Sequence, residues 1–127
     1  MGDANGCTFC EIIHGTRDAE IVLEADTFLC FLDKHPVTEG HALVVPRTHV
    51  QYLDEAEGSV LYEFLERAIM EIRHRYEPDG MNVGLNDGSA AGQTIPHLHW
   101  HIIPRYDGDI SDPTGGVRGV IPAKRTY

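Results

Sequence analysis

The stretch His97-Leu98-His99-Trp100-His101-Ile102-Ile103-Pro104-Arg105 alternates histidines with large apolar residues. Successive side chains of a β-strand point to opposite faces of a sheet, so the alternation predicts a strand over residues 97–103. The three histidines would share one face, and the residues between them would point into a hydrophobic core. Histidines two residues apart on a strand lie about 6.6 Å from one another. That spacing lets each imidazole act on a different part of one ligand.

Short runs of β-branched, aromatic and aliphatic residues predict further strands in the rest of the chain. Two of these runs are separated only by a tight turn at Ala25-Asp26, which indicates a hairpin. Pro46 stops a third run, because proline cannot donate a backbone hydrogen bond. The predicted elements are a short helix over 7–14, strands over 20–23, 27–32, 41–45 and 81–85, and a turn-rich loop over 33–40.

One long helix is predicted from Asp54 or Ser59 to Tyr76. Apolar residues recur there at intervals of three and four, which places them in one stripe along the helix. Asp54 and Glu57 have the spacing of a capping box, and Pro78 would end the helix. We expect the stripe to pack against the core. It consists of Leu61, Phe64, Leu65, Ala68, Ile69 and Ile72.

Short strands in hairpins, with one long and one short helix, indicate the α+β class with an antiparallel sheet. At 127 residues, the chain has the length of one domain. We therefore expect a single domain over 1–127. Within it, residues 1–6 would form a flexible N-terminus, and residues 107–127 would form a C-terminal tail lying over the surface or over a neighbouring subunit.

Charge and hydropathy exclude several classes of partner. The chain has 20 acidic and 10 basic residues, a formal net charge of −10, which argues against binding a nucleic-acid polymer or an anionic membrane. No secretory signal and no run long enough to span a bilayer are present, so we expect a cytoplasmic protein. Three cysteines cannot all pair within one chain, which also favours a reducing compartment.

A polar, glycine-rich loop over residues 86–94 precedes the histidine strand. Its glycines allow backbone N–H groups to approach a ligand closely, and its hydroxyl and amide side chains add donors that suit phosphate oxygens. Such donors beside an imidazole nucleophile and an imidazole acid or base suit phosphoryl transfer. The alternatives are a surface stripe of histidines and a simple hairpin turn at 86–88. The candidate phosphate contacts are Asn86, Ser89, Gln93 and Thr94.

The histidine segment resembles the signature of the histidine triad (HIT) family, in which three histidines alternate with apolar residues. Further blocks resemble that family at compatible spacing, and the resemblance covers residues 7–106. It implies a five-stranded antiparallel sheet with one long and one short helix. It also implies a homodimer in which two such sheets join into a ten-stranded one, with the long helix at the interface. The further blocks are 31–33 with Pro36, 40–46, 82–88 and 92–94.

The same resemblance implies a nucleotide hydrolase or transferase without an organic cofactor. His99 would attack the α-phosphorus of an adenine (purine) nucleotide and form a covalent nucleotidyl-histidine, which water then releases. The peptide carbonyl of His97 would hold the Nδ1–H of His99. His101, and His41 from the facing strand, would contact phosphate oxygens or help to protonate the leaving group. For His41 the alternative is a solvated residue at a strand edge.

Four further residues are implied as substrate contacts. Asp33 would accept hydrogen bonds from the ribose hydroxyls, Phe9 and Ile12 would wall the base, and Arg105 would add positive charge over a polyphosphate tail, aided by Arg118. The alternatives are that Asp33 caps its own turn, that Phe9 and Ile12 are ordinary core residues, and that Arg118 is a surface residue.

Cys7 and Cys10 form a C-x-x-C pair, a spacing that one tetrahedral zinc ion accepts. No second close pair follows, so distant histidines must supply the other ligands, and His49 and His97 are the best candidates. The resemblance supports this set, because some branches of the family carry structural zinc on two cysteines and two histidines. The alternatives are a redox pair and two inert cysteines.

The substrate class is less determined than the nucleophile. We favour a dinucleoside polyphosphate of the Ap4A type, because Arg105 and Arg118 would offset its charge. The first alternative is a nucleoside phosphoramidate hydrolase acting on conjugates such as AMP-NH2 or AMP-lysine. The others are a non-catalytic nucleotide-binding sensor and a zinc-dependent interaction module.

Overall fold

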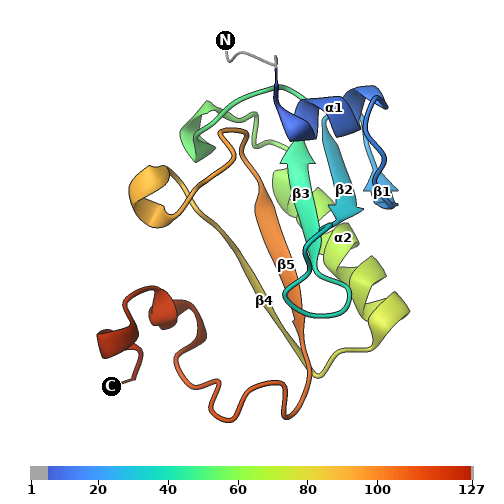
Figure 1. The fold of residues 1–127 in the computed structure, drawn as a ribbon. Coiled ribbons are helices and arrows are strands. Elements are labelled where there is room, and N and C mark those ends of the chain that lie inside the picture. The colour runs from blue at the N-terminus through green and yellow to red at the C-terminus, as the bar shows by residue number, and fades with distance from the viewer. Residues whose placement is uncertain (1–5, 127) are drawn as a thin grey trace.

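The computed structural model describes residues 6–126, which contain a five-stranded antiparallel sheet of order β1-β2-β3-β5-β4 (Figure 1). This arrangement confirms the predicted α+β class. The predicted flexibility of the N-terminus falls almost wholly on residues 1–5, outside the described part. The elements are α1 (Thr8–His14), β1 (Ile21–Glu24), β2 (Phe28–Leu32), β3 (Ala42–Pro46), α2 (Leu61–Tyr76), β4 (Gly80–Leu85) and β5 (Trp100–Arg105).

Strand β5 lies between β3 and β4, so the strand that carries the third histidine is shielded on both edges. His101 pairs with Leu43 of β3 on one side and with Gly84 of β4 on the other. Phe31 of β2 pairs in turn with Leu43. These registers place His101 in one row across four strands of the sheet.

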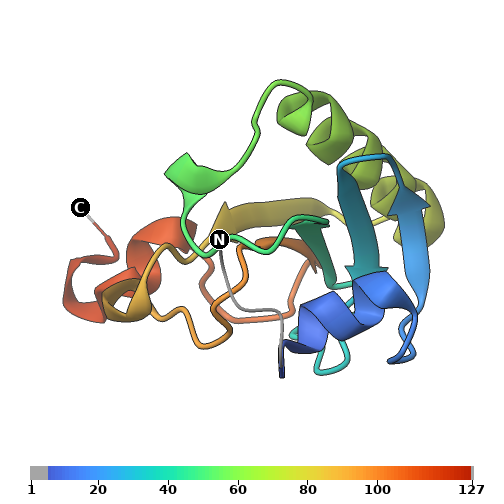
Figure 2. The same ribbon diagram turned by 90° about the horizontal axis from the view of Figure 1, so that it is seen from above.

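The two faces of the sheet carry different layers, as Figure 2 shows: α2 covers one face and α1 lies on the other. The predicted apolar stripe of α2 packs on the sheet, where Phe64, Ala68 and Ile72 are buried against Leu98 and Ile102. The α1 face holds a second, smaller cluster. Its buried members are Cys7, Phe9, Cys10, Leu29, Phe31, Leu43 and Val45.

The predicted limits of β1 to β4 lie within one residue of the observed ones, whereas those of β5 differ by two to three residues. Regular pairing of β5 begins at Trp100 rather than at residue 97; Trp100 pairs with Val44 of β3 and with Leu85, the last residue of β4. The carbonyl of Pro46, the last residue of β3, instead accepts from Nε2 of His97 at 2.8 Å. Pro46 itself belongs to β3, where its missing N–H is tolerated at the strand end.

The predicted capping box at the start of the long helix is wrong. Helix α2 begins at Leu61, with Val60 at the N-cap and no side-chain cap. Residues Leu53–Glu55 form a separate 3-10 turn instead. The carboxylate of Glu57 accepts from the backbone N–H of Ser59, so it is not available to Asp54 in a cap.

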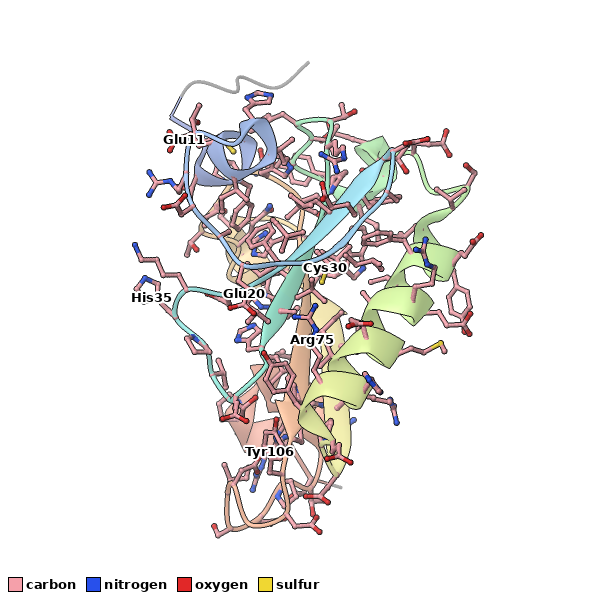
Figure 3. The ribbon with its side chains drawn as sticks, turned by 90° about the vertical axis from the view of Figure 1, so that its right-hand side faces the viewer. Glu11, Glu20, Cys30, His35, Arg75 and Tyr106 are labelled. Atoms are coloured by element: carbon pink, nitrogen blue, oxygen red, sulfur yellow. The ribbon has the colours of Figure 1, made fainter. Side chains whose placement is uncertain are left out.

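The C-terminal half of α2 contacts the segment before β1, through Glu20, and the segment before β3, through Gly40. Figure 3 shows Arg75 beside Glu20, with Nη1 and Oε2 3.7 Å apart, and Cys30 fully buried between sheet and helix. Gly40, just before β3, has a φ of +87° and lies so close to Tyr76 that a Cβ would sit 2.6 Å from its ring. Only glycine suits that contact.

The tail after β5 forms two 3-10 turns, Gly116–Val120 and Pro122–Lys124. It lies beside β4, at the end of the sheet opposite β1 (Figure 1). No helix of the described residues is long and apolar enough to cross a membrane.

Candidate active site

His99 is held with one ring nitrogen free. Its Nδ1 lies 2.9 Å from the carbonyl oxygen of His97, and a carbonyl can only accept a hydrogen bond. Nδ1 therefore carries the proton, and Nε2 keeps its lone pair. The ring is only 7% exposed, packed edge-on against Phe9 at a centroid distance of 5.0 Å. An imidazole of this tautomer, with Nε2 free, has the electronic form of a nucleophile.

His41 and His101 form a chain whose proton positions follow from one backbone group. The N–H of Val37 donates to Nδ1 of His41 at 3.0 Å, so the proton of neutral His41 is on Nε2. That Nε2 lies 3.0 Å from Nδ1 of His101 and donates to it. His101 then carries its own proton on Nε2. The site therefore presents one imidazole lone pair, on His99, beside one imidazole N–H, on His101.

Burial keeps these rings neutral near pH 7. Burial, together with the neighbouring His99 and His41, lowers the pKa of His101 to about 4. Burial also lowers the pKa of His41, while the carboxylate of Asp33 opposes that shift. When His101 is neutral, its hydrogen bond to His41 determines that the proton lies on Nε2 rather than on Nδ1.

Asp33 has two contacts that bear on the two roles considered for it. Oδ1 accepts from the backbone N–H of His35 at 2.9 Å, so the carboxylate does cap its turn. Oδ2 lies 3.5 Å from Nε2 of His41, which places the same carboxylate at the histidine cluster. The cap does not exhaust the group, because Oδ2 still has capacity to accept from a ligand hydroxyl.

The two predicted base contacts lie on α1. Phe9 is buried, with ring centroids 5.6 Å from Phe31 and 5.0 Å from His99. Ile12 is partly buried against the same cluster. Phe9 is thus a core residue and a neighbour of the nucleophile at once.

The loop before the histidines is braced from inside by Gln93. Its Oε1 accepts from the N–H of Gly88, and its Nε2 donates to the carbonyls of Gln51 and Ile95. The amide therefore shapes the loop, and a phosphate contact from it would require one of these bonds to exchange. Gly88 and Gly92 have φ values of +93° and +99°, a conformation that favours glycine. Asn86 is partly buried, and Ser89 and Thr94 are exposed.

Arg105, which was predicted to add positive charge over a polyphosphate tail, is paired within the chain. Its Nε and Nη2 each lie 2.8 Å from an oxygen of Asp109, a bidentate pair, and its Nη1 donates to Oδ1 of Asn82 at 2.8 Å. The pair raises the pKa of Arg105 and lowers that of Asp109. Sequence reasoning missed Asp109 and Asn82. The available signal was the spacing of four residues between Arg105 and Asp109. Because no helix was predicted there, this spacing did not indicate an ion pair.

The four predicted zinc ligands converge at the start of α1. Nδ1 of His97 lies 3.5 Å from both Cys7 Sγ and Cys10 Sγ and 3.1 Å from Nδ1 of His49, which is 3.2 Å from Cys10 Sγ. Zinc bonds of about 2.0–2.3 Å in a tetrahedron give ligand separations of about 3.3–3.8 Å. One ligand atom from each of the four residues lies within 4.8 Å of the other three. The residues are Cys7, Cys10, His49 and His97.

The proton positions also fit a metal. Nε2 of His97 donates to the carbonyl of Pro46, so its Nδ1, which faces the cysteines, has the lone pair that a ligand needs. Burial, with Cys7 adding to it, raises the pKa of the Cys10 thiol to about 12. A Cys10 thiolate here would therefore require a compensating cation. The chemistry of the donor set matches zinc.

The family of the chain follows from comparison with known proteins. The model of the HIT domain family matches residues 14–108. This chain belongs to the HIT family. An uncharacterized HIT-like protein of Methanocaldococcus jannaschii is 42% identical over 105 residues, which cover 81% of each chain. The Arabidopsis thaliana protein named adenylylsulfatase HINT3 is 38% identical over 108 residues, 83% of this chain but 55% of the plant protein.

A solved relative carries a metal. The crystal structure of a zinc-bound histidine triad family protein from Mycobacterium smegmatis matches with a TM-score of 0.75 at 36% identity, covering 84% of this chain and 80% of that one. The likeness supports the HIT fold of this chain, and zinc is bound in that relative.

Proposed function

We propose that this HIT protein is a nucleotidyl hydrolase or transferase that acts at the α-phosphorus of an adenine nucleotide conjugate. One observation carries the proposal: His99 donates through Nδ1 to the carbonyl of His97 and keeps Nε2 free. A protein that only binds nucleotides has no use for a buried nucleophile of fixed tautomer beside a second imidazole that offers an N–H.

The reaction runs in two displacements. Nε2 of His99 forms a bond to the α-phosphorus as the bond to the leaving group breaks, and the leaving group departs with that electron pair. Nε2–H of His101 donates a hydrogen bond to a phosphate oxygen or to the departing atom, where negative charge develops. Water then attacks the nucleotidyl-histidine and releases AMP. Over both steps one water is consumed: its hydroxyl ends on phosphorus and its proton on the leaving group.

The remaining contacts position the nucleotide. Asp33 accepts from the ribose through Oδ2, beside His41, and Phe9 with Ile12 borders the base. The loop over 86–94 supplies donors to the phosphates. Its contributing residues are Asn86, Ser89, Gln93 and Thr94.

The leaving group has two leading candidates. The sequence favours a dinucleoside polyphosphate of the Ap4A type, on the strength of Arg105 and Arg118. Because Arg105 is paired with Asp109, that support is reduced, and a nucleoside phosphoramidate is the second candidate. The Arabidopsis relative's name adds adenylyl sulfate as a third conjugate of AMP to assay.

We also propose that Cys7, Cys10, His49 and His97 hold a structural zinc ion. Such an ion, when bound, neutralises the two thiolates and cross-links α1 to the chain before β5. All four positions come from protein side chains, so the site is closed to substrate. His97 would thus link the metal to the nucleophile, because its carbonyl holds the proton of His99.

The decisive experiment compares wild type with His99→Ala on the unsubstituted AMP phosphoramidate, adenylyl sulfate and diadenosine tetraphosphate. We expect the wild type to release AMP and the variant to lose at least about 10³-fold in turnover. Acid quenching of the wild type should trap AMP on the protein, detectable by intact mass. His74→Ala, which removes an exposed histidine of α2, is the matched control. Nucleotide binding by the wild type without AMP release would favour the non-catalytic alternative.

A further inference from the structure

The loop over 33–41, which joins β2 to β3, reaches the histidine cluster through its own backbone. Its two ends meet where the N–H of Asp33 donates to the carbonyl of His41 at 2.9 Å. Inside the loop, the N–H of His41 donates to the carbonyl of Thr38 at 3.2 Å. The N–H of Val37 donates to Nδ1 of His41 at 3.0 Å. The position of this loop therefore decides which donor the ring of His41 meets.

Two hydroxyl groups tie the loop to the far end of β5. Packing contributes little over residues 34–37, because all four side chains are exposed. The hydroxyl of Thr38 donates to the carbonyl of Pro104 at 2.6 Å. The hydroxyl of Tyr106, which follows β5 directly, donates to the carbonyl of Glu39 at 2.7 Å (Figure 3). These two bonds anchor the loop on either side of the Thr38–Glu39 peptide.

The Val37 bond selects between two opposite arrangements of the histidine pair. A backbone N–H can only donate, so Nδ1 of His41 keeps its lone pair, and its Nε2 donates to Nδ1 of His101 across 3.0 Å. If Nδ1 of His41 carried the proton instead, its Nε2 would accept from Nδ1 of His101. Nε2 of His101 would then have no N–H and would turn a lone pair toward a bound phosphate.

Asp33 favours the first arrangement more weakly. Its Oδ2 lies 3.5 Å from Nε2 of His41, at the outer limit of a hydrogen bond, and a carboxylate accepts the proton there. A loop released from both hydroxyls would therefore give a mixture of the two tautomers rather than a complete exchange. In such a mixture His101 offers its N–H to a phosphate for only part of the time.

We propose that Thr38 and Tyr106 are positioning residues that anchor the loop over 33–41 to β5. The anchor keeps the proton of His41, and through it that of His101, on Nε2. The inference rests on the proposed function, because this is the N–H that His101 gives to a phosphate oxygen or to the departing atom. Negative charge develops there as the bond breaks, so loss of the anchor should lower kcat more than it raises KM.

The test reads the tautomers directly. Nitrogen–proton correlation spectra of histidine-labelled protein at neutral pH distinguish Nδ1–H from Nε2–H imidazoles, and His41→Asn and His101→Asn assign the signals. We expect Nε2–H at both rings in the wild type. In Thr38→Val/Tyr106→Phe both should move toward tautomer averages. On the unsubstituted AMP phosphoramidate, kcat should fall about tenfold or more, since misplaced catalytic groups cost up to about 10²-fold, with a smaller change in KM.

The matched control is Thr16→Val/Tyr62→Phe. It also removes one threonine hydroxyl that donates to a carbonyl, that of Glu11, and one tyrosine hydroxyl, on a ring that is 76% exposed on α2. The control should keep the wild-type spectrum and kcat. Thr38→Ser retains a hydroxyl at the anchor and should keep both as well.

The spectra and the rates separate the possible results. Unchanged tautomers in a folded Thr38→Val/Tyr106→Phe would overturn the inference and leave the proposed function standing, even if kcat fell. An equal tautomer change in the control would overturn it too. Absence of AMP release by the wild type would refute the proposed function, while the spectra would still decide whether the two hydroxyls set the tautomers. If thermal unfolding shows that the double variant does not fold, Tyr106→Phe alone is compared in the same way.

Discussion

Backbone groups set the chemical form of each imidazole in this site. The carbonyl of His97 fixes the proton of His99, and the N–H of Val37 fixes that of His41 and, through it, that of His101. Because peptide groups do not titrate, the tautomers are stable over the range in which the rings stay neutral. A histidine pattern in the sequence shows which residues share a face, but it cannot show which backbone group each ring meets.

The lowered pKa of His101 predicts a loss of stability on acidification. The unfolded chain binds this proton with a pKa of about 6.5, whereas in the folded protein the pKa is about 4. The contribution is therefore complete above about pH 6.5 and is lost as pH falls toward 4, with a slope of at most about 1.4 kcal/mol per pH unit. Urea unfolding between pH 4.5 and 7 should show a shallower slope for His101→Asn than for wild type. His41 shifts in the same direction, so some slope remains.

His74→Asn provides the comparison for that experiment, since it removes an exposed histidine from α2. Equal slopes in wild type and His101→Asn would contradict the assignment of the lost stability to His101.

At the scale of elements, the periodicity of the sequence predicted which side chains of β5 and α2 face the core. The alternation in 97–103 placed the histidines on one face, and intervals of three and four found the stripe of α2. It did not find where β5 begins, because that depends on where β4 ends and on the bond between His97 and Pro46. The polar partners of Gln93 and Arg105 were missed for the same reason, since tertiary contacts supply them.

Helix α1 has seven residues, which is too short for a helix to be stable alone in water. Contacts of its side chains with the rest of the protein must therefore stabilise it. We predict about one zinc per chain in the purified protein and a lower unfolding temperature after chelation. Cys7→Ser and Cys10→Ser should each lose the metal. Cys30→Ala removes a thiol that lies in the other cluster, and it should keep the metal.

Metal content well below one per chain in the wild type would refute the zinc site. Equal loss of metal from Cys30→Ala and Cys7→Ser would show that the thiols act through stability rather than as ligands.

At the scale of the whole molecule, the net charge of −10 leaves the site open to a phosphate. The groups that would contact the phosphate are imidazoles, peptide N–H groups and hydroxyls. Two acidic residues near the site have partners within the chain. Asp109 is bound to Arg105, and Asp33 caps its turn. The composition argues against binding a long polyanion, which needs a broad basic surface. It does not argue against binding one nucleotide through a few local donors.

We predict that the chain forms the homodimer that the family resemblance implies, with the two sheets joined at the outer edge of β4. Light scattering should give twice the chain mass of 14.1 kDa. Val83 on β4 is 37% exposed, and Val83→Lys should weaken a dimer that joins two sheets at this edge. Ile21→Lys is the matched control, because Ile21 is 38% exposed on β1 at the opposite edge. A wild-type mass of one chain, or equal effects of both variants, would contradict this interface.

The HIT match divides the residues of the candidate site into two groups. The match runs over 14–108, so it contains the triad but leaves out Cys7 and Cys10 at one end and the tail turn Gly116–Val120 at the other. A substitution at Cys7 or Cys10 can therefore test the proposed metal site while every residue of the matched range, the triad included, stays unchanged.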